Sequence, residues 1–167
     1  MPNWVYNGLT AQGPKESVEK MKAQLNQPFK RVHDSWNMET GKMEKKLVTY
    51  PNPVFAFWNI IKPTDLDAYD KQADHTLPIA EQLKFEGNDW YSWNIKNWGT
   101  KWDVAVSSDD KAPETYMEEF EDEWTASVYY KFNTAWGVAD KALTNLSSQY
   151  PDILFTLSYE EETGWGR

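Results

Sequence analysis

Apolar and polar residues alternate along this chain with two different periodicities, and each periodicity predicts one type of secondary structure. Residues 3–11 are typical of a strand, which Gly13 and Pro14 end. The next apolar residues recur at helical spacing, which predicts an amphipathic helix over residues 14–25. The apolar face of this helix consists of Val18, Met21 and Leu25.

The middle of the chain is less regular. A hairpin is predicted within residues 29–50, with its tip at residues 40–41, where a glycine favours a turn. The apolar run at residues 54–61 predicts a buried strand, and residues 63–71 predict a helix or turn that begins at a proline. The stretch that follows, residues 72–87, predicts a mixed loop with a short helix.

The spacing of apolar residues changes partway along the tryptophan-rich segment, residues 90–102. Its first half has helical spacing and follows Asn88 or Asp89, either of which can cap a helix. The shared face of that helix consists of Trp90, Trp93 and Asn97. From Trp98 onward every second residue is apolar or Thr, which predicts a strand over residues 98–106.

We interpret this change from helical to strand periodicity as a structural corner between two elements, at which Gly99 permits a close turn or bulge. Trp93 and Trp102 are expected in the core, because large rings bury much area. Asn97, Lys101 and whichever tryptophan stays exposed are then left for binding.

Residues 107–123 form an acidic connection that we expect to become helical after Pro113. Residues 124–133 alternate as a strand, which we expect to pair antiparallel with the strand before it. A helix capped by Thr134 follows, and residues 153–159 alternate as a last strand. The inner face of the helix is predicted to consist of Trp136, Ala139, Leu143 and Leu146.

The order of these elements resembles the split β-α-β plan, with an antiparallel sheet and two helices on one face. We therefore predict a single α+β domain over residues 1–167, with an elaborated middle between about residues 28 and 123. The first residues lack the pattern of a signal peptide, and no apolar run is long enough to span a bilayer. We expect a cytoplasmic protein that makes no contact with a membrane.

Charge narrows the classes of partner. The formal net charge is −9, and eight acidic residues stand against one lysine between Asp109 and Glu123. Such a chain repels phosphate on average, which disfavours direct binding to nucleic acid but permits binding to a basic protein surface. The candidate partner-binding residues, which we call the acidic patch, are Glu118, Glu119, Glu121 and Asp122.

The sequence lacks the common motifs for nucleotide binding, nucleophilic catalysis and metal binding. The sequence contains no phosphate-binding glycine loop, no nucleophile elbow and no cysteine, and its only histidines, His33 and His75, lack metal-ligand spacing. We therefore predict no catalytic residue, no metal and no cofactor. An enzyme acting on an unidentified substrate stays open as an alternative.

A small-ligand binder is the other alternative. The tryptophans of residues 90–102 can wall an aromatic pocket for a nucleotide, with Lys101 meeting a phosphate. The candidate ligand-binding residues are Trp90, Trp93, Asn97, Trp98, Lys101 and Trp102.

Three blocks of the chain resemble one family. They are residues 1–10 with Gly13-Pro14, the string Trp90-Tyr91-x-Trp93-x-x-x-Asn97-Trp98-Gly99-Thr100-Lys101-Trp102, and Phe132-x-Thr134-Ala135-Trp136 followed by Tyr150-Pro151 and Tyr159-Glu160-Glu161. Together they resemble the phage- and plasmid-borne ferredoxin-like proteins of the YubB type. The resemblance spans most of the chain, and its Asn-Trp-Gly-Thr-Lys-Trp string is specific.

The resemblance implies a ferredoxin-like α+β fold without an iron–sulfur cluster, and a mobile-element origin in a bacterial host cell. It implies that residues 28–50 and 107–123 are variable insertions, and it brings no catalytic residues. Our leading expectation is a non-enzymatic phage or plasmid accessory protein that binds a host or defence protein, as an inhibitor of bacterial defence. Its oligomeric state is open.

Overall fold

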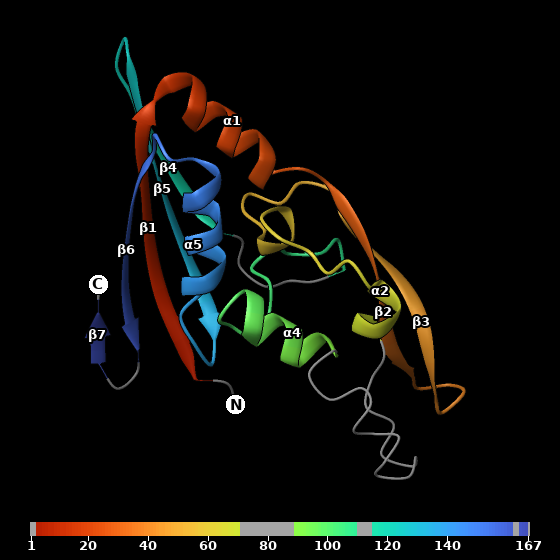
Figure 1. The fold of residues 1–167 in the computed structure, drawn as a ribbon. Helices are drawn as coiled ribbons and strands as arrows, with labels where there is room; N and C mark the ends of the chain where they lie inside the picture. The colour runs from red at the N-terminus through yellow and green to blue at the C-terminus, as the bar shows by residue number, and fades with distance from the viewer. Residues whose placement is uncertain (1–2, 71–88, 110–114, 162–163, 167) are drawn as a thin grey trace.

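The computed structural model describes residues 3–70, 89–109, 115–161 and 164–166. Its main sheet has five antiparallel strands in the order β4-β5-β1-β6-β7, with β1 in the centre (Figure 1). These strands are β1 (Trp4–Pro14), β4 (Tyr116–Glu121), β5 (Thr125–Ala135), β6 (Leu154–Glu161) and β7 (Gly164–Gly166). The expected strands near residues 3–11, 124–133 and 153–159 are confirmed.

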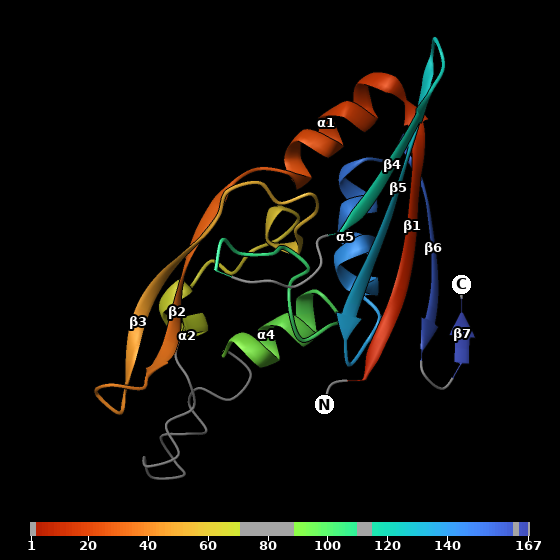
Figure 2. The same ribbon diagram turned by 180° about the vertical axis from the view of Figure 1, so that it is seen from behind.

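Two helices, α1 (Lys15–Leu25) and α5 (Asp140–Gln149), cover the same face of this sheet, as Figures 1 and 2 show from opposite sides. The order β1-α1-β4 and the order β5-α5-β6 are two split β-α-β units, because one strand lies between the outer two in each. The predicted α+β fold, with an antiparallel sheet and helices on one face, is confirmed.

The period-2 pattern of the strands decides which side chains enter the core. In β5 the buried positions alternate with more exposed ones, and the apolar residues buried between sheet and helices are Ala126, Val128, Tyr130 and Phe132. The helix α1 contributes the three residues that its spacing predicts, Val18, Met21 and Leu25, all of them fully buried. Ala139, Leu143 and Leu146 are also buried, as predicted.

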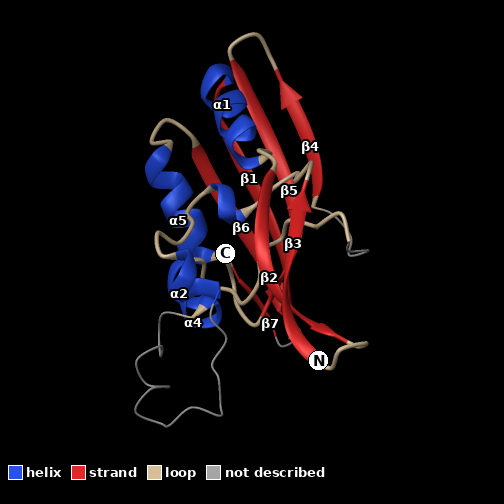
Figure 3. Ribbon diagram, turned by 90° about the vertical axis from the view of Figure 1, so that its right-hand side faces the viewer, coloured by secondary structure: helices blue, strands red, loops and turns tan. Residues whose placement is uncertain are grey.

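Between α1 and β4 the chain makes a second, smaller sheet and several short helices. The hairpin of β2 (Phe29–Asn37) and β3 (Lys42–Tyr50) turns at Gly41, whose φ of 62° is cheap only for glycine. The predicted hairpin tip is thus confirmed, and Figure 3 shows this hairpin in front of the main sheet. The short helices within the described part of this region are η1 (Phe57–Asn59), α2 (Leu66–Asp70) and α4 (Trp90–Asn97).

Two predicted strands are wrong. Residues 54–61 form bends and η1, because the Asp103 carboxylate accepts the backbone N–H groups of Phe57 and Trp58 that a sheet would otherwise pair. Residues 98–106 form no strand either, because β1 and β4 occupy both edges of β5. The antiparallel pairing expected between residues 98–106 and β5 is therefore absent.

Three local expectations at the C-terminal side are also wrong. Tyr116–Glu121, inside the acidic stretch, is the edge strand β4 of the main sheet and not a helix. Thr134 does not cap α5, because its hydroxyl donates to the carbonyl of Gly137 and α5 begins at Asp140. Trp136 is 55% exposed and lies outside the helix.

Some expectations cannot be compared with the fold. Residues 72–87, His75 and Pro113 lie outside the described residues. None of the helices within the described ranges has the length and apolar character needed to cross a membrane.

Candidate functional site

The helix α4 positions the first half of the tryptophan-rich segment. Asp89 caps it, as predicted, by accepting the backbone N–H groups of Tyr91 and Ser92 at 3.0 and 3.1 Å. Trp98, just after the helix, is fully buried, and its indole N–H donates to the carbonyl of Ile61 at 3.0 Å. Trp98 is therefore a core residue and not a wall of an open site.

The remaining candidate ligand-binding residues are not all in one place. Trp90 and Trp93 are partly buried against the core, and Asn97 donates to the Trp93 carbonyl within its own helix. Trp102 is 41% exposed, so its expected place in the core is wrong. Lys101, beside it, is half-buried, so of these two residues only Trp102 is exposed.

A cavity of about 240 Å³ lies between α2, α4, β2 and the segment after α4. We call it the Arg31 pocket. The lining residues that matter for its chemistry are Arg31, Tyr69, Trp90, Asn94, Trp102 and Asp103. The cavity thus brings together two candidate residues of the tryptophan-rich segment and four polar side chains that sequence patterns did not single out.

Arg31, from β2, supplies the positive charge of this pocket. Its guanidinium lies 4.5 Å from the centre of the Trp58 ring and 5.1 Å from that of Tyr69, so it is held by cation–π contacts. One terminal nitrogen donates to the Tyr69 hydroxyl at 2.8 Å. Its Nε atom is buried and has no hydrogen-bond partner in the described residues, which leaves a costly donor unsatisfied in a residue that lines the cavity.

A chain of hydrogen bonds continues from Arg31 into the tryptophan-rich segment. The Tyr69 hydroxyl donates to Asn94 Oδ1 at 2.9 Å, and Asn94 Nδ2 donates to the carbonyl of Lys101 at 2.8 Å. Burial raises the pKa of Tyr69 to about 12, although the Arg31 charge opposes this shift. Tyr69 is therefore a neutral donor at physiological pH.

Asp103 balances the charge of Arg31 but is already occupied. Its two oxygens accept backbone N–H groups from Phe57, Trp58 and Val104 at 2.7 to 3.0 Å. Burial raises the pKa of the Asp103 carboxyl above its ordinary value, against the opposing effects of those N–H groups and of the Arg31 charge. Asp103 makes no hydrogen bond with Arg31 Nε, which stays unpaired in the described residues.

A second feature, which we call the Lys101 cluster, adjoins the pocket at Trp102. The Lys101 ammonium lies 4.7 Å from the centre of the Trp102 ring, 5.8 Å from that of Tyr91 and 5.9 Å from that of Trp136. Each of these rings is at least 41% exposed. Trp4 packs against the Trp102 ring, with 6.2 Å between ring centres.

The backbone that carries the Lys101 cluster is unusual. Trp136 adopts a φ of 71°, which is rare for a residue with a side chain. Gly99 and Gly137 allow the two segments to approach closely, since a Cβ on Gly137 would lie 2.6 Å from the Gly99 carbonyl oxygen. The Ala135 carbonyl then accepts hydrogen bonds from the Thr100 hydroxyl and the Lys101 N–H.

Three residues of the acidic patch lie on the two faces of the edge strand β4, and Asp122 directly follows the strand. Glu119 and Glu121 form ion pairs with Lys22 and Lys15 of α1, the latter at 3.0 Å. Glu118 accepts a hydrogen bond from Tyr116 on the same strand. Asp122 accepts the N–H groups of Trp124 and Thr125 in the turn to β5, and the hydrogen bonds to Thr125 hold its pKa below the ordinary value.

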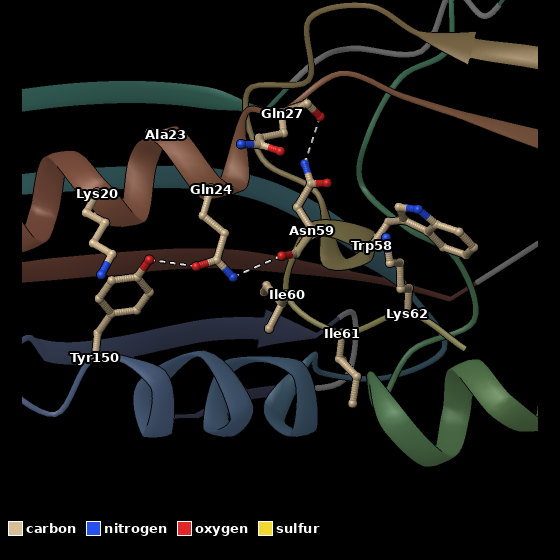
Figure 4. Close-up of a pocket in the computed structure, with 10 residues that line it drawn as sticks. All are labelled: Lys20, Ala23, Gln24, Gln27, Trp58, Asn59, Ile60, Ile61, Lys62 and Tyr150. Carbon is tan, nitrogen blue, oxygen red and sulfur yellow. Dashed lines mark hydrogen bonds between the residues drawn. The ribbon is translucent and has the colours of Figure 1, made fainter. Parts of the chain in front are cut away.

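A larger cavity, of about 450 Å³, lies between α1, η1 and the end of α5. Figure 4 shows that Gln24 bridges its walls, accepting from the Tyr150 hydroxyl at 2.6 Å and donating to the Asn59 carbonyl at 3.0 Å. The Asn59 amide in turn donates to the Gln27 carbonyl. Because these polar groups satisfy one another, this cavity is a weaker candidate than the Arg31 pocket.

Local sequence patterns could have found only part of this site. Asn94 lies midway between Trp90 and Trp98 at a spacing of four, so it shares their helix face and interrupts it with a polar group. Arg31 and Tyr69 carry no such signal, because they come from distant segments of different structure. Their meeting with Asn94 is a property of the tertiary fold.

No curated protein and no solved structure matches this chain significantly. The sheet order and the helices on one face define a ferredoxin-like α+β fold. Residues 101–167, which include β4, β5, α5, β6 and β7, match the family model of the ferredoxin-like domain in Api92-like protein.

Proposed function

We propose that this protein binds a small planar, polar ligand, such as a nucleobase or nucleoside, in the Arg31 pocket. The observation that carries the proposal is that Arg31 lines this cavity while its buried Nε has no hydrogen-bond partner in the described residues. An acceptor on a ligand that meets the Arg31 guanidinium would form a charge-assisted hydrogen bond. Trp90 and Trp102 offer ring surfaces for contact with a planar ligand.

The size of the cavity limits the ligand. At about 240 Å³ it is below the roughly 300 to 1,000 Å³ of pockets for drug-sized molecules, so it fits a single ring system. The polar lining is mixed, because Arg31 brings N–H donors while Asn94 and Asp103 bring oxygens. Such a lining suits a heterocycle with both donor and acceptor edges.

The test is a binding titration with the common nucleobases, nucleosides and nucleotides, followed by tryptophan fluorescence and calorimetry. We expect at least one to bind, and Arg31→Lys to weaken binding about tenfold or more, because lysine keeps the charge but lacks the planar guanidinium. Lys30→Met, at an exposed neighbour on β2, is the control and should bind as the wild type does. Silence across the panel, or unchanged binding by Arg31→Lys, would refute the pocket.

The edge strand β4 favours a second candidate, a phage or plasmid accessory protein that binds a host or defence protein. Every residue of β4 is exposed, including Tyr116 and Phe120, and its free edge carries acidic side chains. An edge of this kind can meet a basic partner surface. The mobile-element origin rests on the resemblance to YubB-type proteins and belongs to the same proposal.

A charge reversal tests this candidate. Glu118→Lys should weaken a complex with a partner captured from host cells and should reduce the salt dependence of binding. Glu118 is chosen because it has no ion pair with α1 in the described residues, unlike Glu119 and Glu121. Glu160→Lys, an equal change at an exposed position of β6, is the control. If both variants bind alike, β4 is not the interface.

A further inference from the structure

The Lys101 cluster has the features of an anion site beside the Arg31 pocket. We propose that Lys101 binds the phosphate group of a ligand whose ring occupies the Arg31 pocket, so that the ligand is a phosphorylated nucleoside. This inference rests on the proposed ligand binding in that pocket. It adds the class of ligand and a second binding position formed by Tyr91, Lys101, Trp102 and Trp136.

The charge of Lys101 is the first argument. Among the residues that the structure describes, no carboxylate or other acceptor pairs with its ammonium, although the chain carries 26 acidic residues. Its neighbours are ring faces, which attract a cation but accept none of its three N–H groups strongly. A phosphate oxygen would supply the missing acceptor and a charge-assisted hydrogen bond.

The rigidity of the cluster is the second argument. The Lys101 backbone is held at both ends, because its N–H donates to the Ala135 carbonyl and its carbonyl accepts from Asn94. The neighbouring Trp136 is kept at a positive φ that costs free energy. Strain of this kind persists where the surrounding structure enforces it, and it concentrates at binding sites.

Continuity with the pocket is the third argument. Trp102 lines the Arg31 pocket and also lies under the Lys101 ammonium. Asn94 likewise lines the pocket and holds the Lys101 carbonyl. Because the cavity holds one ring system, any further group of the ligand must extend beyond it, and these two shared residues connect Lys101 to the pocket wall.

The charge of the whole protein explains why such a position needs a dedicated cation. A chain with a net charge of −9 repels phosphate at long range. A lysine beside the pocket, without a competing acidic partner in the described residues, counters this repulsion at short range. Binding of the phosphorylated ligand should therefore weaken as salt increases, more steeply than binding of the unphosphorylated one.

The experiment compares the four common ribonucleosides with their 5′-monophosphates by calorimetry on the intact protein. For a nucleoside that binds, we expect its monophosphate to bind about tenfold tighter to the wild type, which corresponds to one charge-assisted hydrogen bond. In Lys101→Met this preference should disappear, while affinity for the nucleoside itself stays the same. Lys96→Met, at an exposed lysine of α4, removes the same charge and should keep the preference.

Each other outcome decides against the inference. Equal affinity of the wild type for nucleoside and monophosphate would overturn the phosphate position and leave the Arg31 pocket standing. A parallel loss of both ligands in Lys101→Met would show that Lys101 acts on the pocket and not on a phosphate. A failure of all eight compounds to bind the wild type would overturn the pocket and the phosphate position together.

Discussion

The hydroxyl of Tyr69 donates a hydrogen bond to Asn94 Oδ1 at 2.9 Å and so joins α2 to α4 beneath the Arg31 pocket. Both residues are buried, Tyr69 at 1% and Asn94 at 3% exposure. The same hydroxyl accepts from Arg31 at 2.8 Å. One phenol therefore satisfies two polar side chains in a place that water reaches poorly, and its removal should be costly.

Tyr69→Phe should lower the free energy of unfolding by about 1 to 3 kcal/mol, because two buried partners lose their hydrogen bond. Urea unfolding followed by tryptophan fluorescence measures the change. A loss well below this range would mean that Arg31 and Asn94 find each other or water when the phenol is removed.

Tyr130→Phe should have the opposite sign. The Tyr130 hydroxyl is buried in the core and has no hydrogen-bond partner, so its removal relieves a desolvation cost. We expect the free energy of unfolding to rise by up to about 1 kcal/mol, measured under the same conditions as for Tyr69→Phe. A clear destabilisation would reveal a partner for this hydroxyl in solution.

Alkaline pH should destabilise the protein through Tyr69. Its folded-state pKa is raised from 10.0 to about 12, so the unfolded chain releases this proton first as the pH rises. The stabilisation is complete below pH 10 and is lost as the pH rises from 10 to about 12. Urea unfolding at pH 9, 10 and 11 should show a steeper decline for the wild type than for Tyr69→Phe. Equal slopes would contradict the raised pKa.

Backbone strain at Trp136 is separable from the loss of its ring. Trp136→Gly and Trp136→Ala both remove the ring, but only glycine adopts a φ of 71° without strain. The glycine variant should be more stable than the alanine variant by about 1 kcal/mol, as measured by thermal or urea unfolding. Equal stabilities would indicate that this backbone relaxes once the tryptophan is gone.

Local patterns predicted the elements that repeat regularly. The strands β1, β5 and β6 and the helix α1 are long enough for a period of 2 or 3.6 residues to show which face is buried. The apolar face of α5 was predicted too, but its N-cap was placed five residues early, at Thr134 instead of Ala139. Helix ends depend on capping contacts, which several nearby residue types can offer.

Two short apolar runs were wrongly predicted to be strands, and the reason is physical. Residues 54–61 and 98–106 have the composition of strands, yet a strand needs a free neighbour in a sheet. The Asp103 side chain takes up the backbone donors of the first run, and β4 and β1 already flank β5. The strand β4 was missed because its composition is acidic, although an exposed sheet edge tolerates charged side chains.

The sequence by itself determined that this is an α+β chain of the split β-α-β kind, and it drew attention to Lys101 and Trp102. Periodicity is a local property, so one segment at a time reveals which of its faces is apolar. Only the tertiary structure decided that Trp98 is core and that Trp102 lines a cavity. It also brought together Arg31, Tyr69 and Asn94, whose contacts join segments far apart in the chain and leave no pattern in any one of them.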